Sequence, residues 1–268
     1  MPRLIQVENI KTFSSNTFRV IISLHLLLFI LVLLSISRIE LSLGEFAVSR
    51  LFQFPYLWEF FPWVASWFNL LLAVLIIVLT CNEFRFNTFR QQVMNGMHEG
   101  HLIMGKVYII LLIALYALLL VVVSGFVSGG MNKAADSQWI NLAGFQDVGM
   151  YFLQTIAYMT LAFLFAVLFK TNGLSIVIFI LYLFPGEVIL RNLIFPSIEN
   201  YFPAKLISGL TPFPELFTDQ LATVPGGNLQ VGPAATAAMG SGESAALTLL
   251  YTVVFVVVAY VILKRRSL

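Results

Sequence analysis

The sequence predicts an all-α polytopic membrane protein, and three observations lead to that fold class. Of the 268 residues, 59% are hydrophobic and only 10% are charged, too few charges to cover the surface of a soluble globule. The mean hydropathy is +0.92. The apolar residues also gather in separate runs that approach the roughly 20 residues a helix needs to cross a bilayer. We therefore expect residues 1–268 to form a single transmembrane domain.

Six apolar runs are expected to cross the membrane. They cover residues 20–36, 64–81, 107–127, 148–169, 174–190 and 246–263. With the N-terminus inside, the inner segments hold ten basic and three acidic residues, whereas the outer segments hold five basic and ten acidic residues. Because excess Lys and Arg mark the cytoplasmic side, both termini are expected in the cytoplasm and the chain in the inner (cytoplasmic) membrane.

The N-terminal part, residues 1–19, is expected to be an interfacial helix. Leu4, Val7, Ile10 and Phe13 are spaced three apart, which favours a helix lying in the inner interface. A frayed tail is the alternative. The first span then contains a lone histidine, His25, which is more typical of neutral packing against a backbone or hydroxyl partner than of proton transport.

The next connections have recognisable compositions. The outer loop from residue 37 to 63 is rich in aromatic residues and predicts an aromatic belt at the membrane interface. Gly125 and Gly129 have the G-x-x-x-G spacing, which fits either a dimerisation site or a chance match. The Lys-Thr-Asn-Gly sequence at 170–173 predicts a tight inner turn, so the fourth and fifth spans should form a helical hairpin.

The largest segment outside the spans, residues 191–245, is expected to be extracytoplasmic and partly re-entrant. Pro185 and Gly186 should kink the fifth span just before it, and Glu187 lies four residues before Arg191, which predicts an ion pair on a helix. The first half of the segment is apolar enough for short helices dipping into the outer leaflet. The second half is rich in Gly and Pro and is expected to be mobile.

The long polar segment 82–106, between the second and third spans, is the most informative part of the sequence. Phe86, Phe89, Val93 and Met97 are spaced by three, four and four residues, which places them on one face of a helix. A turn and a lead-in to the next apolar run follow. Such a helix needs a surface, either a membrane or another protein.

Two motifs within this segment resemble ligand-binding sites but lack residues that those sites require. Residues 100–106 have the G-x-x-x-x-G-K spacing of a phosphate-binding loop, but Val107 stands where Ser or Thr must hold magnesium and no strand precedes it. His98 and His101 are three apart rather than four, so they do not form a zinc-binding H-E-x-x-H pair.

The spans also lack the groups that other membrane activities need. No Asp, Glu, Lys or Arg lies near the centre of a span, which disfavours an ion-driven secondary carrier. No catalytic constellation is present, so the chain is not expected to be an enzyme. The one cysteine, Cys81, excludes an internal disulfide and suggests an apolar filler.

The central segment resembles the region between the second and third spans of type-2 ABC transporter permeases. Glu83 matches the acidic residue that closes the second span, and Asn87-Thr88 match a Gly-Thr pair. Residues 89–94 match the helix, 95–96 the turn, and 105–106 the Gly-Lys of the lead-in. Asn87 replaces the usual glycine, and His98-Glu99 replace a small residue and a base.

The resemblance implies the membrane subunit of an ATP-driven exporter, with a hydrophobic or amphipathic substrate. The chain would dimerise with itself or a similar permease within membrane lipid, and would contact no nucleic acid. It would hold no cofactor, since ATP and Mg²⁺ belong to a separate cytoplasmic ATPase. The coupling helix, at about residues 86–96, would fill a groove on that ATPase, with charged residues on the rim. The residues expected at this contact are Glu83, Arg85, Phe86, Thr88, Phe89, Arg90, Val93, Met94, Gly96 and Met97. The alternative is a membrane scaffold or assembly subunit that docks another partner through the same segment.

Overall fold

The computed structural model describes residues 2–38, 42–43, 46–132, 141–194, 196–214 and 240–265. Apart from two paired strands of two residues each, β1 (Ser42–Leu43) and β2 (Phe46–Ala47), the regular elements in these ranges are helices. The long ones are α1 (Pro2–Ser14), α2 (Asn16–Ser37), α3 (Leu57–Ser66), α4 (Asn69–Arg85), α6 (Glu99–Met131), α7 (Gln146–Phe169), α8 (Asn172–Leu181) and α12 (Ser241–Arg265). The short ones are η1 (Val48–Phe52), α5 (Thr88–Met94), η2 (Tyr182–Gly186), α9 (Glu187–Ile189), η3 (Leu190–Ile194), η4 (Pro196–Tyr201) and α10 (Pro203–Ser208).

Several of these helices are long and apolar enough to cross a membrane. By length and composition they are Asn16–Ser37, Gly100–Met131, Gln146–Phe169, Asn172–Leu193 and Ser241–Arg265. Helices α3 and α4 pass the same test together, with a bend of 42° between them. The predicted all-α fold with several apolar spans is therefore confirmed, and the chain has the architecture of a multi-pass membrane protein.

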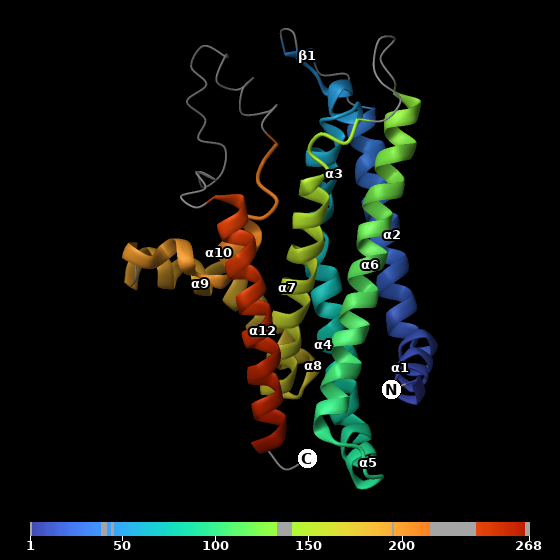
Figure 1. Ribbon diagram of the computed structural model, residues 1–268, viewed down its shortest axis with the longest axis vertical. Coiled ribbons are helices and arrows are strands. Elements are labelled where there is room, and N and C mark those ends of the chain that lie inside the picture. Colours follow the sequence, from blue (N-terminus) through green and yellow to red (C-terminus); the bar gives the residue numbers. More distant parts are fainter. Residues whose placement is uncertain are drawn as a thin grey trace.

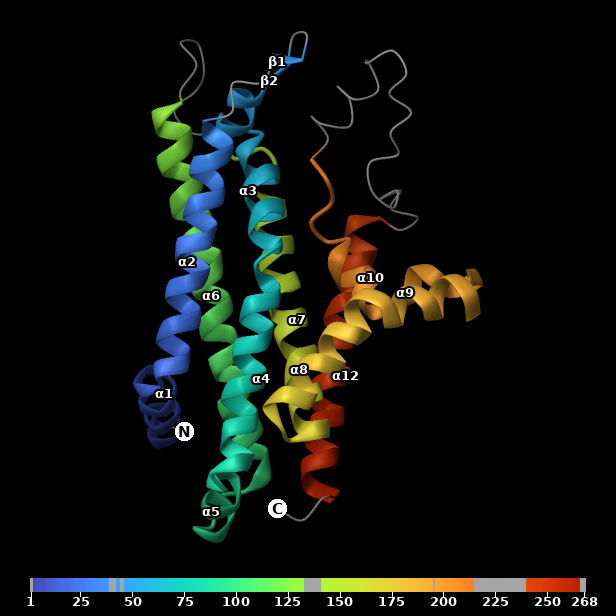
Figure 2. The same cartoon turned by 180° about the vertical axis from the view of Figure 1, so that it is seen from behind.

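The long helices form an elongated bundle with α7 at its centre (Figures 1 and 2). Helix α7 contacts α3, α4, α6, α8 and α12. Its small residues Ala157, Ala162 and Ala166 are buried, which lets neighbouring helices approach closely. Helix α5 and the end of α12 lie at one end of the bundle, and α3 lies toward the other (Figure 1).

Several aromatic residues before the second span are part of the core and do not form the predicted aromatic belt, whereas Tyr56 and Trp67 are 41% and 52% exposed. Trp58, Phe60 and Phe61 are at most 1% exposed. They pack there because α6 offers glycines opposite them. A Cβ on Gly125 would lie 2.7 Å from Trp58 Cζ3, and one on Gly129 only 2.3 Å from Phe54 Cε2. The G-x-x-x-G spacing therefore serves close packing of α6 against the α3 region within one chain.

The N-terminal helix and the first long helix are separated at Ser15. Helix α1 ends at Ser14 and α2 begins at Asn16, so the apolar helix starts four residues earlier than the predicted span. His25 is buried against α6, with its Nδ1 3.4 Å from the hydroxyl of Tyr116. The predicted packing of this histidine against a hydroxyl partner is confirmed.

The hairpin of α7 and α8 is also confirmed, with only Lys170 and Thr171 between the two helices. The chain then continues through η2, α9 and η3 as one helical segment that turns away from the bundle and projects sideways in both views (Figures 1 and 2). Pro185 lies within η2, where the helix widens to π geometry.

Glu187 does not form the predicted ion pair with Arg191, because its carboxylate binds a different element. It accepts hydrogen bonds from the backbone N–H groups of Ala204 and Lys205, each at 2.8 Å, in the first turn of α10. At the other end of α10, Gln154 donates to the carbonyl oxygen of Ile207 at 3.0 Å. Helix α10 is thus held at both ends. The segment predicted to be mobile lies for the most part outside the described residues.

Candidate functional site

Helix α5 lies beyond the ends of α4 and α6, joined to each by a turn that needs a left-handed residue. The first is Asn87, with φ of +53°, and the second is Gly96, with φ of +83°. Asparagine adopts this conformation more readily than other residues with a Cβ, which suits Asn87 to this turn. Thr88 Oγ1 donates to the carbonyl oxygen of Glu83 at 3.2 Å, which ties α5 to α4.

The predicted helix at 89–94 is confirmed, but Phe86 does not share the predicted apolar face with Phe89. Phe89 is 1% exposed and packs on Phe84, with ring centroids 4.8 Å apart, whereas Phe86 is 63% exposed. The two rings separate because Asn87 ends the helical geometry between them. Met94 is the most exposed apolar residue of α5, at 77%.

The remaining predicted contact residues surround this helix. Arg85, Arg90 and Gly96 are exposed, and Thr88, Val93 and Met97 are half-buried. The exposed predicted contact residues with long side chains are Phe86, Arg90 and Met94, with Arg85 beside Phe86. We call these four residues the α5 tip.

Glu83 is not on the rim of this surface but inside a buried cluster of four charged residues. The cluster joins Glu8 and Lys11 of α1, Glu83 of α4 and Lys106 of α6, and we call it the charge cluster. Lys106 Nζ contacts Glu8 Oε2 at 2.8 Å and also pairs with Glu83 Oε1. Lys11 Nζ lies 2.9 Å from both Glu8 Oε1 and Glu83 Oε1. The two positive and two negative charges balance.

Burial makes this cluster energetically demanding. The side chains of Glu8, Lys106 and Glu83 are 2%, 6% and 8% exposed, and that of Lys11 is 26% exposed. Burial alone would raise the pKa of Glu8, but Lys106 and Lys11 outweigh it, so that the pKa of this carboxyl lies below its ordinary value. Glu8 is therefore a carboxylate at neutral pH.

Gly105 explains how α1 comes close enough to α6 for this pairing. A Cβ at Gly105 would lie 3.0 Å from Glu8 Cγ and 3.4 Å from Glu8 Cδ. The Gly-Lys pair at the start of the third span thus has two separate functions, since the glycine admits the side chain of Glu8 and the lysine neutralises it.

The sequence signals for this cluster were present but weak. Glu8 and Lys11 are three apart on one helix, and Lys106 is a single charge at the edge of a long apolar run. Nothing local indicates that they meet, because Lys106 follows Glu8 by 98 residues.

The two rejected motifs have structural functions here. Residues 100–106 lie inside α6, so they form a helix and not a phosphate-binding loop. His98 precedes that helix, and its Nδ1 accepts a hydrogen bond from the backbone N–H of Gly100 at 3.0 Å. The His98 side chain therefore caps α6. Among the described residues, no group of three or more His, Cys, Asp or Glu side chains is arranged to hold a metal ion.

Comparison with known proteins gives a family but no activity. A family profile described as "Protein of unknown function (DUF2705)" matches residues 30–268. This range includes Glu83, Lys106 and the whole α5 tip, whereas Glu8 and Lys11 precede it. No curated protein sequence gives a significant match. Because the profile covers most of its length, the chain belongs to the DUF2705 family.

Proposed function

We propose that this chain is the six-span membrane subunit of an ATP-driven ABC transporter, with both termini in the cytoplasm of the cell. Its partner would be a separate cytoplasmic ATPase that binds ATP and Mg²⁺. The observation that supports this best is the α5 region, a short helix outside the bundle that exposes Phe86 and Met94 but is fixed to the bundle from within.

The internal attachment is what a coupling element requires. Phe89 packs inward, and Glu83 and Lys106 join the ends of α4 and α6 on either side of α5. A displacement of the α5 tip must therefore move α4 and α6 together, and the charge cluster carries α1 with them. Because Lys106 pairs with both Glu8 and Glu83, α1, α4 and α6 are expected to move as one body.

The α5 tip has the composition of a small docking surface. Phe86 and Met94 would enter apolar pockets on the ATPase, where a few buried side chains supply most of the binding energy. Arg85 and Arg90 would lie at the rim, where charge affects orientation and association rate more than affinity.

The rest of the transport cycle follows from this arrangement. Two permease chains, identical or similar, would enclose a path for a hydrophobic or amphipathic substrate, and closure of the ATPase pair would tilt α4 and α6. Helix α10, held by Glu187 and Gln154, would be the re-entrant part of the outer segment.

The test compares two exposed methionines, one at the end of α5 and one at the end of α6. Met94 follows Phe89 on α5 and is 77% exposed, and Met131 ends α6 and is 81% exposed. We expect Met94→Asp to abolish co-purification of a P-loop ATPase with the tagged chain, and with it ATP-dependent transport. Met131→Asp should leave both unchanged.

Each result bears on a definite alternative. If the Met94→Asp and wild-type chains retain the same ATPase, the α5 tip is not the coupling surface. If the wild-type chain retains a cytoplasmic partner that lacks an ATPase signature, and Met94→Asp releases it, the chain is a membrane scaffold or assembly subunit.

A further inference from the structure

A buried polar network lies in the apolar core between α4, α7 and the end of α10. Its members are Asn69, which begins α4, Gln154 and Thr155 of α7, and Thr211, which follows α10. Their exposed fractions are 2%, 2%, 0% and 7%. Burying such groups is costly unless each is hydrogen-bonded, and in membrane helices they mark positions that have a function. We call these four residues the amide network.

Asn69 fixes the orientation of the Gln154 side chain. Asn69 Nδ2 donates to Gln154 Oε1 at 3.2 Å, and Asn69 Oδ1 accepts from the hydroxyl of Thr155 at 3.0 Å. Both ends of the Asn69 amide are thus paired, so this amide cannot rotate without breaking a hydrogen bond. Because Asn69 holds the oxygen of the Gln154 amide, the nitrogen of that amide is turned toward α10.

The Gln154 amide in turn holds the end of α10. Its Nε2 donates to the carbonyl oxygen of Ile207 at 3.0 Å and to the hydroxyl of Thr211 at 2.8 Å. Helix α10 has six residues, too few for its own backbone hydrogen bonds to keep it folded. Its position therefore depends on its buried apolar side chains, on Gln154 at this end and on Glu187 at the other end.

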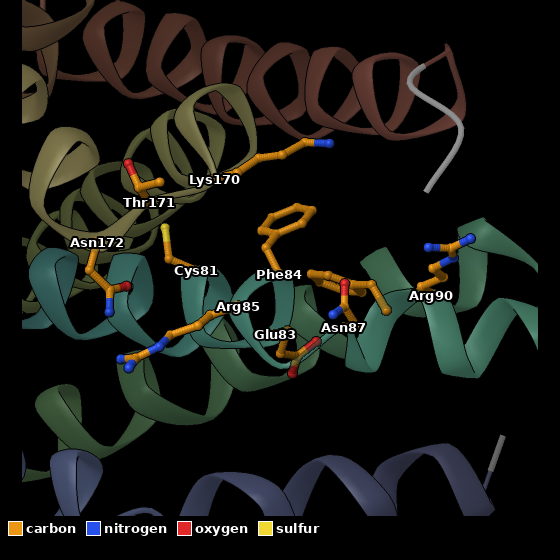
Figure 3. A pocket seen from close by; sticks show the side chains of 10 residues that line it. Cys81, Glu83, Phe84, Arg85, Asn87, Arg90, Lys170, Thr171 and Asn172 are labelled. Carbon is orange, nitrogen blue, oxygen red and sulfur yellow. The ribbon is translucent and has the colours of Figure 1, made fainter.

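Asn69 lies where the second span bends. Helices α3 and α4 meet at an angle of 42°, and Asn69 is the first residue of α4 after that bend. Helix α4 then runs for 17 residues, or about 25 Å, before the chain enters α5. There α4 and α5 form one wall of a cavity of about 510 Å³, and the turn between α7 and α8 forms another (Figure 3). The cavity leaves space beside the α5 end of α4, whereas the Asn69 end is tied to α7.

A tilt of α4 must therefore act on the amide network. A helix that is pushed at its α5 end turns about its other end, where it joins α3. The turn changes the direction of the Asn69 side chain, and hydrogen bonds weaken steeply when their geometry departs from linear. Gln154 then loses the partner that holds its Oε1, and its Nε2 is no longer held toward α10.

We propose that Asn69 is the positioning residue through which a tilt of α4 releases α10. Asn69 holds Gln154, and Gln154 holds one end of α10. When α5 is displaced, this chain of hydrogen bonds breaks and α10 keeps only its attachment to Glu187 and its apolar contacts. The cause of the tilt rests on the proposed function, since it requires the ATPase, but the dependence of α10 on Asn69 does not.

The first experiment measures hydrogen–deuterium exchange in the purified full-length chain. The signal comes from backbone N–H groups that are hydrogen-bonded in and just after α10, those of Leu206, Gly209 and Leu210. A buried hydrogen bond contributes about fivefold to an equilibrium constant. Asn69→Leu should therefore speed this exchange about fivefold, although the Asn69 side chain bonds to α7 and not to α10. Gln154→Leu removes two hydrogen bonds to the α10 end and should speed it about 25-fold.

Asn82→Leu is the matched control. Asn82 lies near the other end of α4, and its Oδ1 accepts from Asn172 Nδ2 at 3.1 Å, so the variant also removes an amide hydrogen bond from α4. Exchange at α10 should stay at the wild-type rate. If Asn69→Leu does not fold, Thr155→Val removes one hydrogen bond to Asn69, keeps the side-chain shape and should speed the exchange in the same way.

The double variant Asn69→Leu with Gln154→Leu tests the order of the chain of contacts. If Asn69 acts through Gln154, the double variant should exchange like Gln154→Leu alone. A further fivefold increase in the double variant, or a wild-type rate in the folded Asn69→Leu variant, would overturn the proposal.

The second experiment adds the ATPase partner. In the complex, a non-hydrolysable ATP analogue should speed exchange at α10 of the wild-type chain and should have no further effect in Asn69→Leu, where α10 is already released. Equal increases in both chains would mean that the tilt reaches α10 by another route, against the proposal. If no ATPase accompanies the chain, the proposed function fails, whereas exchange in the isolated chain still decides whether Asn69 positions α10.

Discussion

The charge cluster permits a quantitative prediction, because its two lysines contact the same two carboxylates but differ in burial. The Lys106 side chain is 6% exposed and that of Lys11 is 26% exposed. Removing one partner of a buried ion pair costs about 3–5 kcal/mol, whereas an exposed pair contributes only about 0–1 kcal/mol. In Lys106→Gln, Lys11 still contacts both Glu8 and Glu83, which limits the loss to the lower end.

We therefore expect Lys106→Gln to lower the free energy of unfolding by about 3 kcal/mol and Lys11→Gln by about 1 kcal/mol. The assay is a denaturing-detergent titration of the purified chain, followed by circular dichroism at neutral pH. The double variant Glu83→Gln with Lys106→Gln should be more stable than Lys106→Gln alone, because it leaves no unbalanced buried charge.

The comparison between the two lysines decides the outcome. If Lys11→Gln costs as much as Lys106→Gln, burial does not control the energy of the cluster. If Lys106→Gln remains within about 0.5 kcal/mol of the wild type, which is the usual range for a surface substitution, the cluster is not a buried network at all.

Two more predictions concern other parts of the fold. Because the pKa of Glu8 is held below its ordinary 4.5 in the folded chain, the contribution of Glu8 to stability should be fully present above that pH and lost as the pH falls further. Melting temperatures measured against pH should show this loss of stability in acid, and Glu8→Gln should remove the loss. If the melting temperature already falls between pH 7 and 5.5, the pKa of Glu8 is raised instead. For α6, Gly129→Ala should destabilise the chain by about 1–3 kcal/mol, because the new methyl group would meet Phe54. Gly130→Ala has nothing within 4 Å and is the matched control, so similar melting temperatures for the two variants would contradict the packing argument.

The sequence was a reliable guide to features that depend on short stretches of chain. Apolar runs indicated the long helices, and the Lys170 turn indicated the α7–α8 hairpin. The helix at α5 was also predictable from its polarity and spacing. These features follow from hydrophobic burial and local turn chemistry, which neighbouring residues determine.

The errors came from contacts between distant elements. Periodicity placed Phe86 and Phe89 on one face, because the left-handed conformation of Asn87 leaves no trace in hydrophobic spacing. Glu187 was assigned a partner four residues away, but it binds the backbone of α10 instead. The aromatic residues around Trp58 were assigned to an interface because the glycines of α6 that receive them lie far along the chain.

The same long separation gives the charge cluster a consequence for biosynthesis. Glu8 and Lys11 are synthesised first, and Lys106 follows Glu83 by 23 residues and Glu8 by 98. Until the start of α6 has been made, Lys11 is the one lysine of the charge cluster available to pair with Glu8 and Glu83. Helix α1 therefore lacks its most buried ion-pair partner until α6 has been made, and Lys106, the last residue of the charge cluster to be synthesised, completes the attachment of α1.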